Sequence, residues 1–441
     1  MILRRSVKLL GAALLIMGRP AFAVPVPRLA LPPSVAAPKV LPISVDAELD
    51  AFTAQRRGAP LWFRSGEGPE GAAALSRILR RGSLDGLTSG PSLADEVELA
   101  AANAITGDAK AIARADRTLS IAWLTYVGAL NGGKSEVIYY DPALARRVPD
   151  VAVTLKALAQ APSIPKHLES VSDVNPLYAS LRDSAWDNMK HSGTAIPEHR
   201  LLQNLARARD FPVTGRFIVV NAATQRLMMV EGGRITGSMK VIVGRANSQT
   251  PMLASTIWYA TLNPYWYVPT DLAQKLIAAH VQKDPGYLKS KGYEVISDFG
   301  VAPTMMSSSE IDWKAVEAGT AQVYLRQLPG DDNSMGKIKF SFPSDTGVYL
   351  HDTENHGLFD KVSRILSNGC VRLEDAQRLG TWLMDGVVTA STGRPEQQVM
   401  LPRGVPVFLT YITAHDQDGE LVFDSDVYGR DVQNGAEARP L

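Results

Sequence analysis

The chain has 441 residues, of which 45% are hydrophobic and 21% charged, and this length and composition suit two or three folded domains. Its 46 basic side chains nearly balance its 45 acidic ones, so we expect no nucleic-acid partner. The single cysteine, Cys370, excludes an internal disulfide and cysteine-cluster metal sites, and the seven histidines are scattered, so we expect no metal and no cofactor.

The N-terminus has the pattern of a secretory signal. Arg4, Arg5 and Lys8 precede an apolar run at 9–17, and the small residues Ala21 and Ala23 mark a cleavage site. The apolar run is too short to span a bilayer, so we expect residues 1–23 to be removed and the mature chain to lack a membrane span; an uncleaved anchor is the alternative. Residues 24–44 are rich in proline, which favours extended structure.

Residues 45–209 have helical periodicity and are predicted to form a helical scaffold domain. We find no group of candidate catalytic or binding residues in this region. Apolar residues recur at three-to-four spacing, Asp108 can cap a long helix, and Asn131-Gly132-Gly133 can end it. The predicted helices are 70–81, 93–105, 108–130, 151–160, 176–190 and 198–209.

After Pro212 the apolar period changes to two, which predicts a mainly β domain over 210–430, followed by a tail at 431–441. The expected strands are 217–221, 227–231, 238–244, 255–263, 337–342, 347–351, 405–413 and 421–428. A helix-rich insertion at 271–320 interrupts them. The chain as a whole is therefore predicted to be of the α+β class.

The chemistry is predicted to lie in two runs, Tyr349 to Thr353 and Ser367 to Leu373. Asn368-Gly369 supplies a sharp turn that can expose Cys370 as a nucleophile, and His351 at a strand end can act as its general base. The backbone N–H groups of Asn368, Gly369 and Cys370 can form an oxyanion hole. Arg372 and a helix predicted at 374–384 both favour a thiolate. The alternative is a small buried cysteine with no chemical role.

These runs resemble the signature of the YkuD-type L,D-transpeptidase catalytic domain, and the wider pattern is similar to the large YcbB-like members with a helical scaffold. Supporting runs in the same order are 243–245, 250–251, 263–269, 284–288, 326–330, 333–336 and 358–359, so that the resemblance covers roughly residues 212–430. Asn368 departs from the family pattern, which often has histidine there. The small peptidoglycan-binding domain of larger relatives has no counterpart, because only residues 191–209 separate the two parts.

The resemblance implies a periplasmic enzyme that cross-links peptidoglycan stem peptides through a thioester on Cys370. The donor would be a tetrapeptide and the acceptor an amine, giving 3-3 or 1-3 links. His351 would move the protons, with its ring oriented by the Asp352 carbonyl. Cell-wall synthesis proteins would be partners, and carbapenems would acylate the thiol. Resolution of the thioester by water or by a protein amine, and a non-catalytic wall-binding scaffold, are the alternatives.

The resemblance also indicates substrate-binding residues and a cap, 271–320, over the site. These residues are Tyr349, Trp266, Arg372, Ser367, Asp352 and Arg326. Core packing is the alternative for Tyr349 and Trp266, and bracing of the turn is the alternative for Arg372. His356 lies five residues from His351, but no third ligand marks out a metal site.

Overall fold

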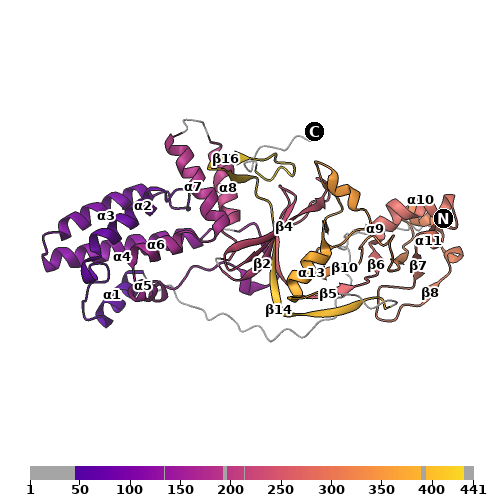
Figure 1. Cartoon of the computed structure of the whole chain (residues 1–441), viewed down its shortest axis with the longest axis horizontal. Coiled ribbons are helices and arrows are strands. Elements are labelled where there is room, and N and C mark those ends of the chain that lie inside the picture. The colour runs from indigo at the N-terminus through magenta and orange to yellow at the C-terminus, as the bar shows by residue number, and fades with distance from the viewer. Residues whose placement is uncertain (1–44, 134, 192–195, 213, 389–393, 432–441) are drawn as a thin grey trace, which may run out of the picture.

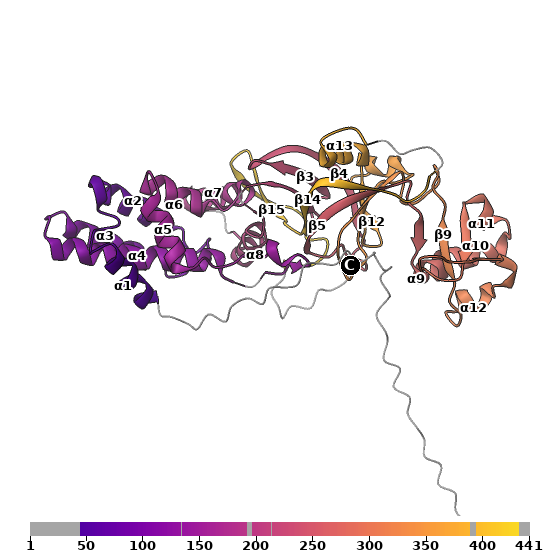
Figure 2. The same cartoon turned by 90° about the horizontal axis from the view of Figure 1, so that it is seen from below.

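A computed structural model of the chain describes residues 45–133, 135–191, 196–212, 214–388 and 394–431. The molecule is elongated, with a helical domain at one end, a β domain in the middle and a small mixed unit at the far end (Figure 1). The turned view in Figure 2 shows the same succession of three parts. The predicted signal segment, the proline-rich segment and residues 432–441 lie outside the described residues. No helix among the described residues is long and apolar enough to cross a membrane.

The helical domain packs around a core that includes the fully buried Trp62 and Trp123. Asp108 caps its longest helix as predicted, because its carboxylate accepts the Ala111 N–H at 2.8 Å. Asp116, inside the same helix, accepts the backbone N–H groups of the segment before the second helix. The helices are α1 (Val45–Gln55), α2 (Gly68–Arg80), α3 (Gly90–Ala104), α4 (Ala109–Asn131), α5 (Val151–Gln160), α6 (Ile164–Ser172), α7 (Pro176–His191) and α8 (Glu198–Ala208).

The middle domain is a β-sheet that closes on itself. The strands follow the order β5-β10-β11-β13-β4-β3-β2-β14, and β14 also pairs with β5, which completes a barrel. Their bounds are β2 (Arg216–Asn221), β3 (Arg226–Glu231), β4 (Arg234–Gly244), β5 (Leu253–Leu262), β10 (Ile338–Ser341), β11 (Leu350–His351), β13 (Val371–Leu373) and β14 (Gln397–Thr410). A further short strand, β12 (Ile365–Ser367), pairs with β4. The α+β class expected from the sequence is confirmed.

The barrel has an apolar core, and its strands alternate between that core and the outer face. Phe340, Leu350 and Val371 are at most 1% exposed and belong to the core. Helix α13 (Ala376–Met384) adds Leu379 and Leu383 to the same cluster. Because side chains alternate along a strand, the residues flanking these core positions point outward, and they include His351 and Cys370.

The segment expected to be helix-rich, 271–320, is helix-rich, and it belongs to a mixed unit that also contains short strands. It holds a four-stranded antiparallel sheet in the order β6-β9-β7-β8, built from β6 (Trp266–Val268), β7 (Tyr293–Ile296), β8 (Met305–Met306) and β9 (Tyr324–Gln327). Short helical segments pack on this sheet around an apolar core of their own, namely α9 (Thr270–Leu272), the π-helical turn η3 (Ala273–Ile277), α10 (Ala278–Lys283), α11 (Tyr287–Ser290) and α12 (Trp313–Glu317). The unit therefore begins before residue 271 and ends after residue 320.

Two segments join the helical domain to the barrel. Strand β1 (Ile138–Tyr139) leaves the helical domain and pairs in parallel with β5. The hairpin of β15 (Ala414–Gln417) and β16 (Glu420–Phe423) returns from the barrel and contributes Ala414 to the helical core. Asp431, expected to start a tail, is instead only 7% exposed and forms ion pairs with α8.

Candidate active site

Two neighbouring strands place the predicted chemical residues on one outer face of the barrel. Strands β11 and β13 run in parallel with His351 opposite Arg372 and Leu350 opposite Val371. The alternation of a strand therefore puts Tyr349, His351, Cys370 and Arg372 on the same side. The sequence separation of 19 residues between His351 and Cys370 is bridged by this strand pairing.

Lys339 completes this face, and the sequence analysis missed it. It lies opposite His351 on β10, and its Nζ lies 5.3 Å from the centre of the Tyr349 ring. Burial lowers the pKa of Lys339, while the charges of Glu396 and Cys370 act in the opposite direction. From the sequence alone, Lys339 looks like an ordinary solvent-facing residue of a half-buried strand, because it alternates with the apolar residues Ile338 and Phe340.

Hydrogen bonds within the turn fix the backbone around Cys370. Ser367 Oγ donates to the Cys370 carbonyl at 2.6 Å and accepts the Gly369 N–H at 3.1 Å. Thr250 Oγ1 donates to the Gly369 carbonyl at 2.9 Å. Gly369 has a φ of +116°, which a side chain would make unfavourable.

These bonds bear on two of the predicted roles. The Gly369 N–H is already engaged by Ser367 and is no longer a donor for the predicted oxyanion hole. Ser367 holds the turn through its hydroxyl, and its predicted contact with a substrate stays a prediction. The N–H groups of Asn368 and Cys370 have no acceptor among the described residues, so they are the donors that the turn offers.

Burial favours the neutral form of the Cys370 thiol, whereas the sequence analysis expected its surroundings to favour a thiolate. Burial raises its pKa above the ordinary 9.0, while the Tyr349 backbone and the charges of Arg372 and Lys339 act to lower it. The helix expected at residue 374 begins at Ala376, after strand β13, so its N-terminus does not follow the thiol directly. The thiol donates to the Gly347 carbonyl, with 3.9 Å between Sγ and O, rather than to His351.

The His351 ring is also neutral. Burial and the nearby charge of Arg372 lower its pKa to about 3, and the ring is only 4% exposed. Its Nδ1 lies 2.6 Å from the Asp352 carbonyl, which can only accept, so Nδ1 carries the proton. The other nitrogen, Nε2, then carries the lone pair and can act as a base, and a hydrogen bond with the Met335 backbone also acts to raise the pKa of the ring.

The side chains of Asp352 and Asn368 point to bracing roles. The Asp352 carboxylate accepts the Lys337 N–H at 2.8 Å and lies 3.5 Å from His356 Nε2, so it supports the preceding loop, and its predicted contact with a substrate stays a prediction. The exposed Asn368 accepts a hydrogen bond from Arg245 at 2.9 Å. No group of three or more potential metal ligands occurs within the described ranges.

Trp266 and Arg326 belong to the insertion. Trp266 lies on β6 with its ring 6.2 Å from that of Tyr293, and Arg326 pairs with Glu294 at 2.7 Å and lies over the Tyr265 ring. The interactions of both residues therefore lie within the insertion and its flank rather than with Cys370 or His351. Arg372 differs, because its guanidinium forms no ion pair with any carboxylate that the structure describes.

The comparisons with known proteins agree with this geometry. Residues 215–408 match the L,D-transpeptidase catalytic domain family (YkuD), and residues 47–184 match the Scaffold domain family. The chain carries an L,D-transpeptidase catalytic domain behind a Scaffold domain. A Haemophilus influenzae protein named "Putative L,D-transpeptidase" is 29% identical over 273 residues, which is 60% of this chain and 55% of that protein. The chain thus spans about half the length of that curated relative.

Solved structures with a likeness to this chain include an L,D-transpeptidase from Mycobacterium smegmatis and a mutant L,D-transpeptidase from Enterococcus faecium. The first is 12% identical and the second 11%, with TM-scores of 0.22 and 0.21. Each alignment covers 45% of this chain, with 59% of the first structure and 52% of the second. Scores this low carry no weight in assigning the fold, which rests on the family matches and on the barrel itself.

Proposed function

We propose that this L,D-transpeptidase domain forms a thioester between Cys370 and a peptidoglycan stem peptide, and passes the acyl group to the amine of a second stem peptide. The observation that carries the proposal is the shared face of Cys370 and His351 on paired strands, with a turn that presents free N–H donors. The family match supports acyl transfer, and the only cysteine of the chain lies at the site.

In the first half of the reaction, His351 Nε2 takes the thiol proton as Sγ attacks the carbonyl of the third stem residue. The oxyanion is stabilised by the N–H groups of Asn368 and Cys370. The C–N bond then breaks, and the His351 imidazolium returns the proton to the leaving D-alanine amine. A neutral Cys370 thiol and a neutral His351 ring suit this scheme, because the proton passes from the thiol to the ring only as the sulfur attacks the carbonyl. Hydrogen bonds between such groups often shorten only when substrate binds.

In the second half, the acceptor amine attacks the thioester and His351 takes its proton. The C–S bond breaks, and the thiolate recovers a proton from the imidazolium. The partly exposed Arg372 lies beside both groups and suits a carboxylate of the donor peptide. Because peptidoglycan lies outside the cytoplasmic membrane, the proposed reaction implies that the protein acts there.

The test is incubation of the purified chain with disaccharide-tetrapeptide, followed by mass analysis of the products. Dimers that have lost one D-alanine support cross-linking, whereas tripeptide monomers alone indicate transfer to water. Cys370→Ala should abolish both products while the circular dichroism spectrum stays unchanged. Products formed at the wild-type rate by Cys370→Ala would overturn the proposal.

A further inference from the structure

The C-terminal segment 424–431 contacts the backbone that supports the nucleophile turn. The Tyr428 hydroxyl donates to the Gly244 carbonyl at 2.6 Å and accepts the Thr250 N–H at 3.4 Å. Thr250 Oγ1 in turn accepts the Gly244 N–H at 3.0 Å and donates to the Gly369 carbonyl at 2.9 Å. One buried residue, Thr250, therefore lies between Tyr428 of the C-terminal segment and Gly369, the residue next to Cys370.

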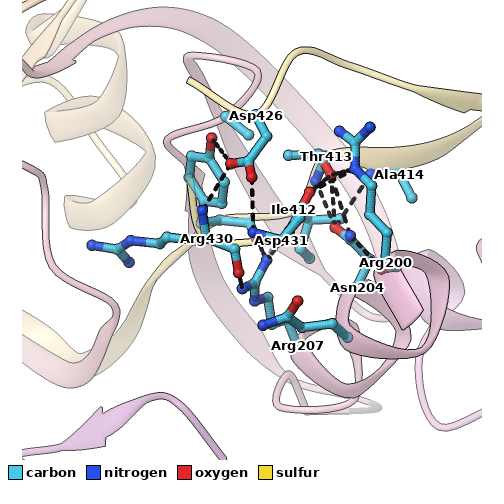
Figure 3. Close-up of polar contacts among 12 residues, drawn as sticks. Arg200, Asn204, Arg207, Ile412, Thr413, Ala414, Asp426, Arg430 and Asp431 are labelled. Carbon is cyan, nitrogen blue, oxygen red and sulfur yellow. Dashed lines mark hydrogen bonds and ion pairs between the residues drawn. The ribbon is translucent and has the colours of Figure 1, made fainter. Parts of the chain in front are cut away.

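The other end of the same segment is tied to helix α8 of the helical domain. Arg207 extends from α8 to Asp431, with 2.6 Å between Nη1 and Oδ1, and Arg200 pairs with the second carboxylate oxygen at 2.8 Å (Figure 3). The side chains of Arg207 and Asp431 are 1% and 3% exposed. Burial would raise the pKa of Asp431, but hydrogen bonds from Thr413 and both arginines, with the charge of Arg207, lower it.

The two ends are joined through stacked rings and Arg430. The rings of Tyr411 and Tyr428 lie 5.0 Å apart, and the Tyr428 N–H donates to the Tyr411 hydroxyl at 2.9 Å. Arg207 donates to the carbonyls of Tyr411 and Arg430, and Arg430 donates to Gln249, next to Thr250. Direct contacts thus run without a break from α8 to the Gly369 carbonyl.

We propose that Tyr428 and Asp431 are positioning residues, which tie the turn before Cys370 to helix α8 so that the helical domain holds the nucleophile in place. Local structure is a weak support for this turn, since β12 and β13 have three residues each and Gly369 has a left-handed φ. The effect on turnover rests on the proposed function, whereas the effect on the backbone does not.

The test combines amide hydrogen exchange with kinetics. Tyr428→Phe removes one hydroxyl and keeps the stacked ring, and Asp431→Asn removes the charge. Both should speed exchange in a peptide spanning 365–373 by about fivefold, the worth of one hydrogen bond. Both should also lower kcat for cross-linking with little change in KM. Tyr126→Phe is the control, because it removes a buried hydroxyl within the helical domain.

The outcomes separate the proposals. Faster exchange at 365–373 in both variants, but not in Tyr126→Phe, supports the proposed connection between helix α8 and the turn before Cys370. Unchanged exchange there in Tyr428→Phe would overturn it. An effect of Tyr428→Phe without one of Asp431→Asn would remove helix α8 from the proposal. If the wild-type chain forms no product from stem peptides, the proposed function fails, and the exchange data still decide whether the tie exists.

Discussion

The buried neutral state of His351 predicts an acid-dependent loss of stability. The folded chain holds the ring neutral down to about pH 3, whereas the unfolded chain takes up a proton near pH 6.5. Between these values the unfolded state binds more protons, so stability falls as the pH is lowered. Each pH unit costs about 1.4 kcal/mol per proton, so that the loss between pH 6.5 and pH 4 is about 3 kcal/mol.

His351→Gln removes the titrating group and keeps a side chain of similar polarity. The free energy of unfolding of the catalytic domain, measured with urea at pH 7, 6, 5 and 4, should fall by about 3 kcal/mol more in the wild type than in this variant. His356→Gln is the matched control, because the His356 side chain is 58% exposed and gains little from burial. Equal pH dependence in the wild type and His351→Gln would refute the assignment of a buried neutral ring.

Three further substitutions test other parts of the site and fold. Lys339→Met should slow alkylation of Cys370 by iodoacetamide between pH 7 and 9, because the lysine charge lowers the pKa of the thiol; the exposed Lys337→Met should match the wild type. Gly369→Ala should lower kcat and cost about 1–3 kcal/mol in urea unfolding, because alanine is strained at a φ of +116°. Asp108→Ala should cost about 1 kcal/mol in unfolding of the helical domain, because it removes a helix cap, and an unchanged midpoint would contradict that role.

Local sequence signals account for much of the fold. The α4 helix was predicted closely because a capping aspartate and a glycine pair bound an apolar repeat, and both signals are local. Strands such as β2 and β3 were predicted because each is a short apolar run bounded by turn residues, and β2 is buried along nearly its whole length. These features depend on residues close in sequence.

Features that depend on distant pairing were not predicted. Strand β13 has three residues, too few for a period, and it forms only because β11 and β4 lie on either side. The helix-rich insertion was predicted, but its strands were not, because they are short and the helical segment beside them is the stronger signal. Closure of the barrel through β14 and β5 joins segments more than 130 residues apart, and no local pattern records it.

The candidate site could be predicted only in part from the sequence. Cys370 and His351 were predicted because a cysteine on a sharp turn and a histidine at a strand end suit a nucleophile and its general base. Their protonation states depend on burial, which the sequence does not show. Lys339 was missed because an outward lysine on a short strand is usually solvated. Asp431 was assigned to a tail because its partners, such as Arg207, lie more than 200 residues away.

The central claim is a covalent acyl-enzyme on Cys370, and intact-protein mass spectrometry tests it directly. Wild-type protein mixed with donor tetrapeptide in the absence of an acceptor should gain the mass of the peptide minus D-alanine. Digestion should place that mass on the peptide containing Cys370, and hydroxylamine should remove it, as expected for a thioester. Turnover without such an adduct, or an adduct on another residue, would contradict the account.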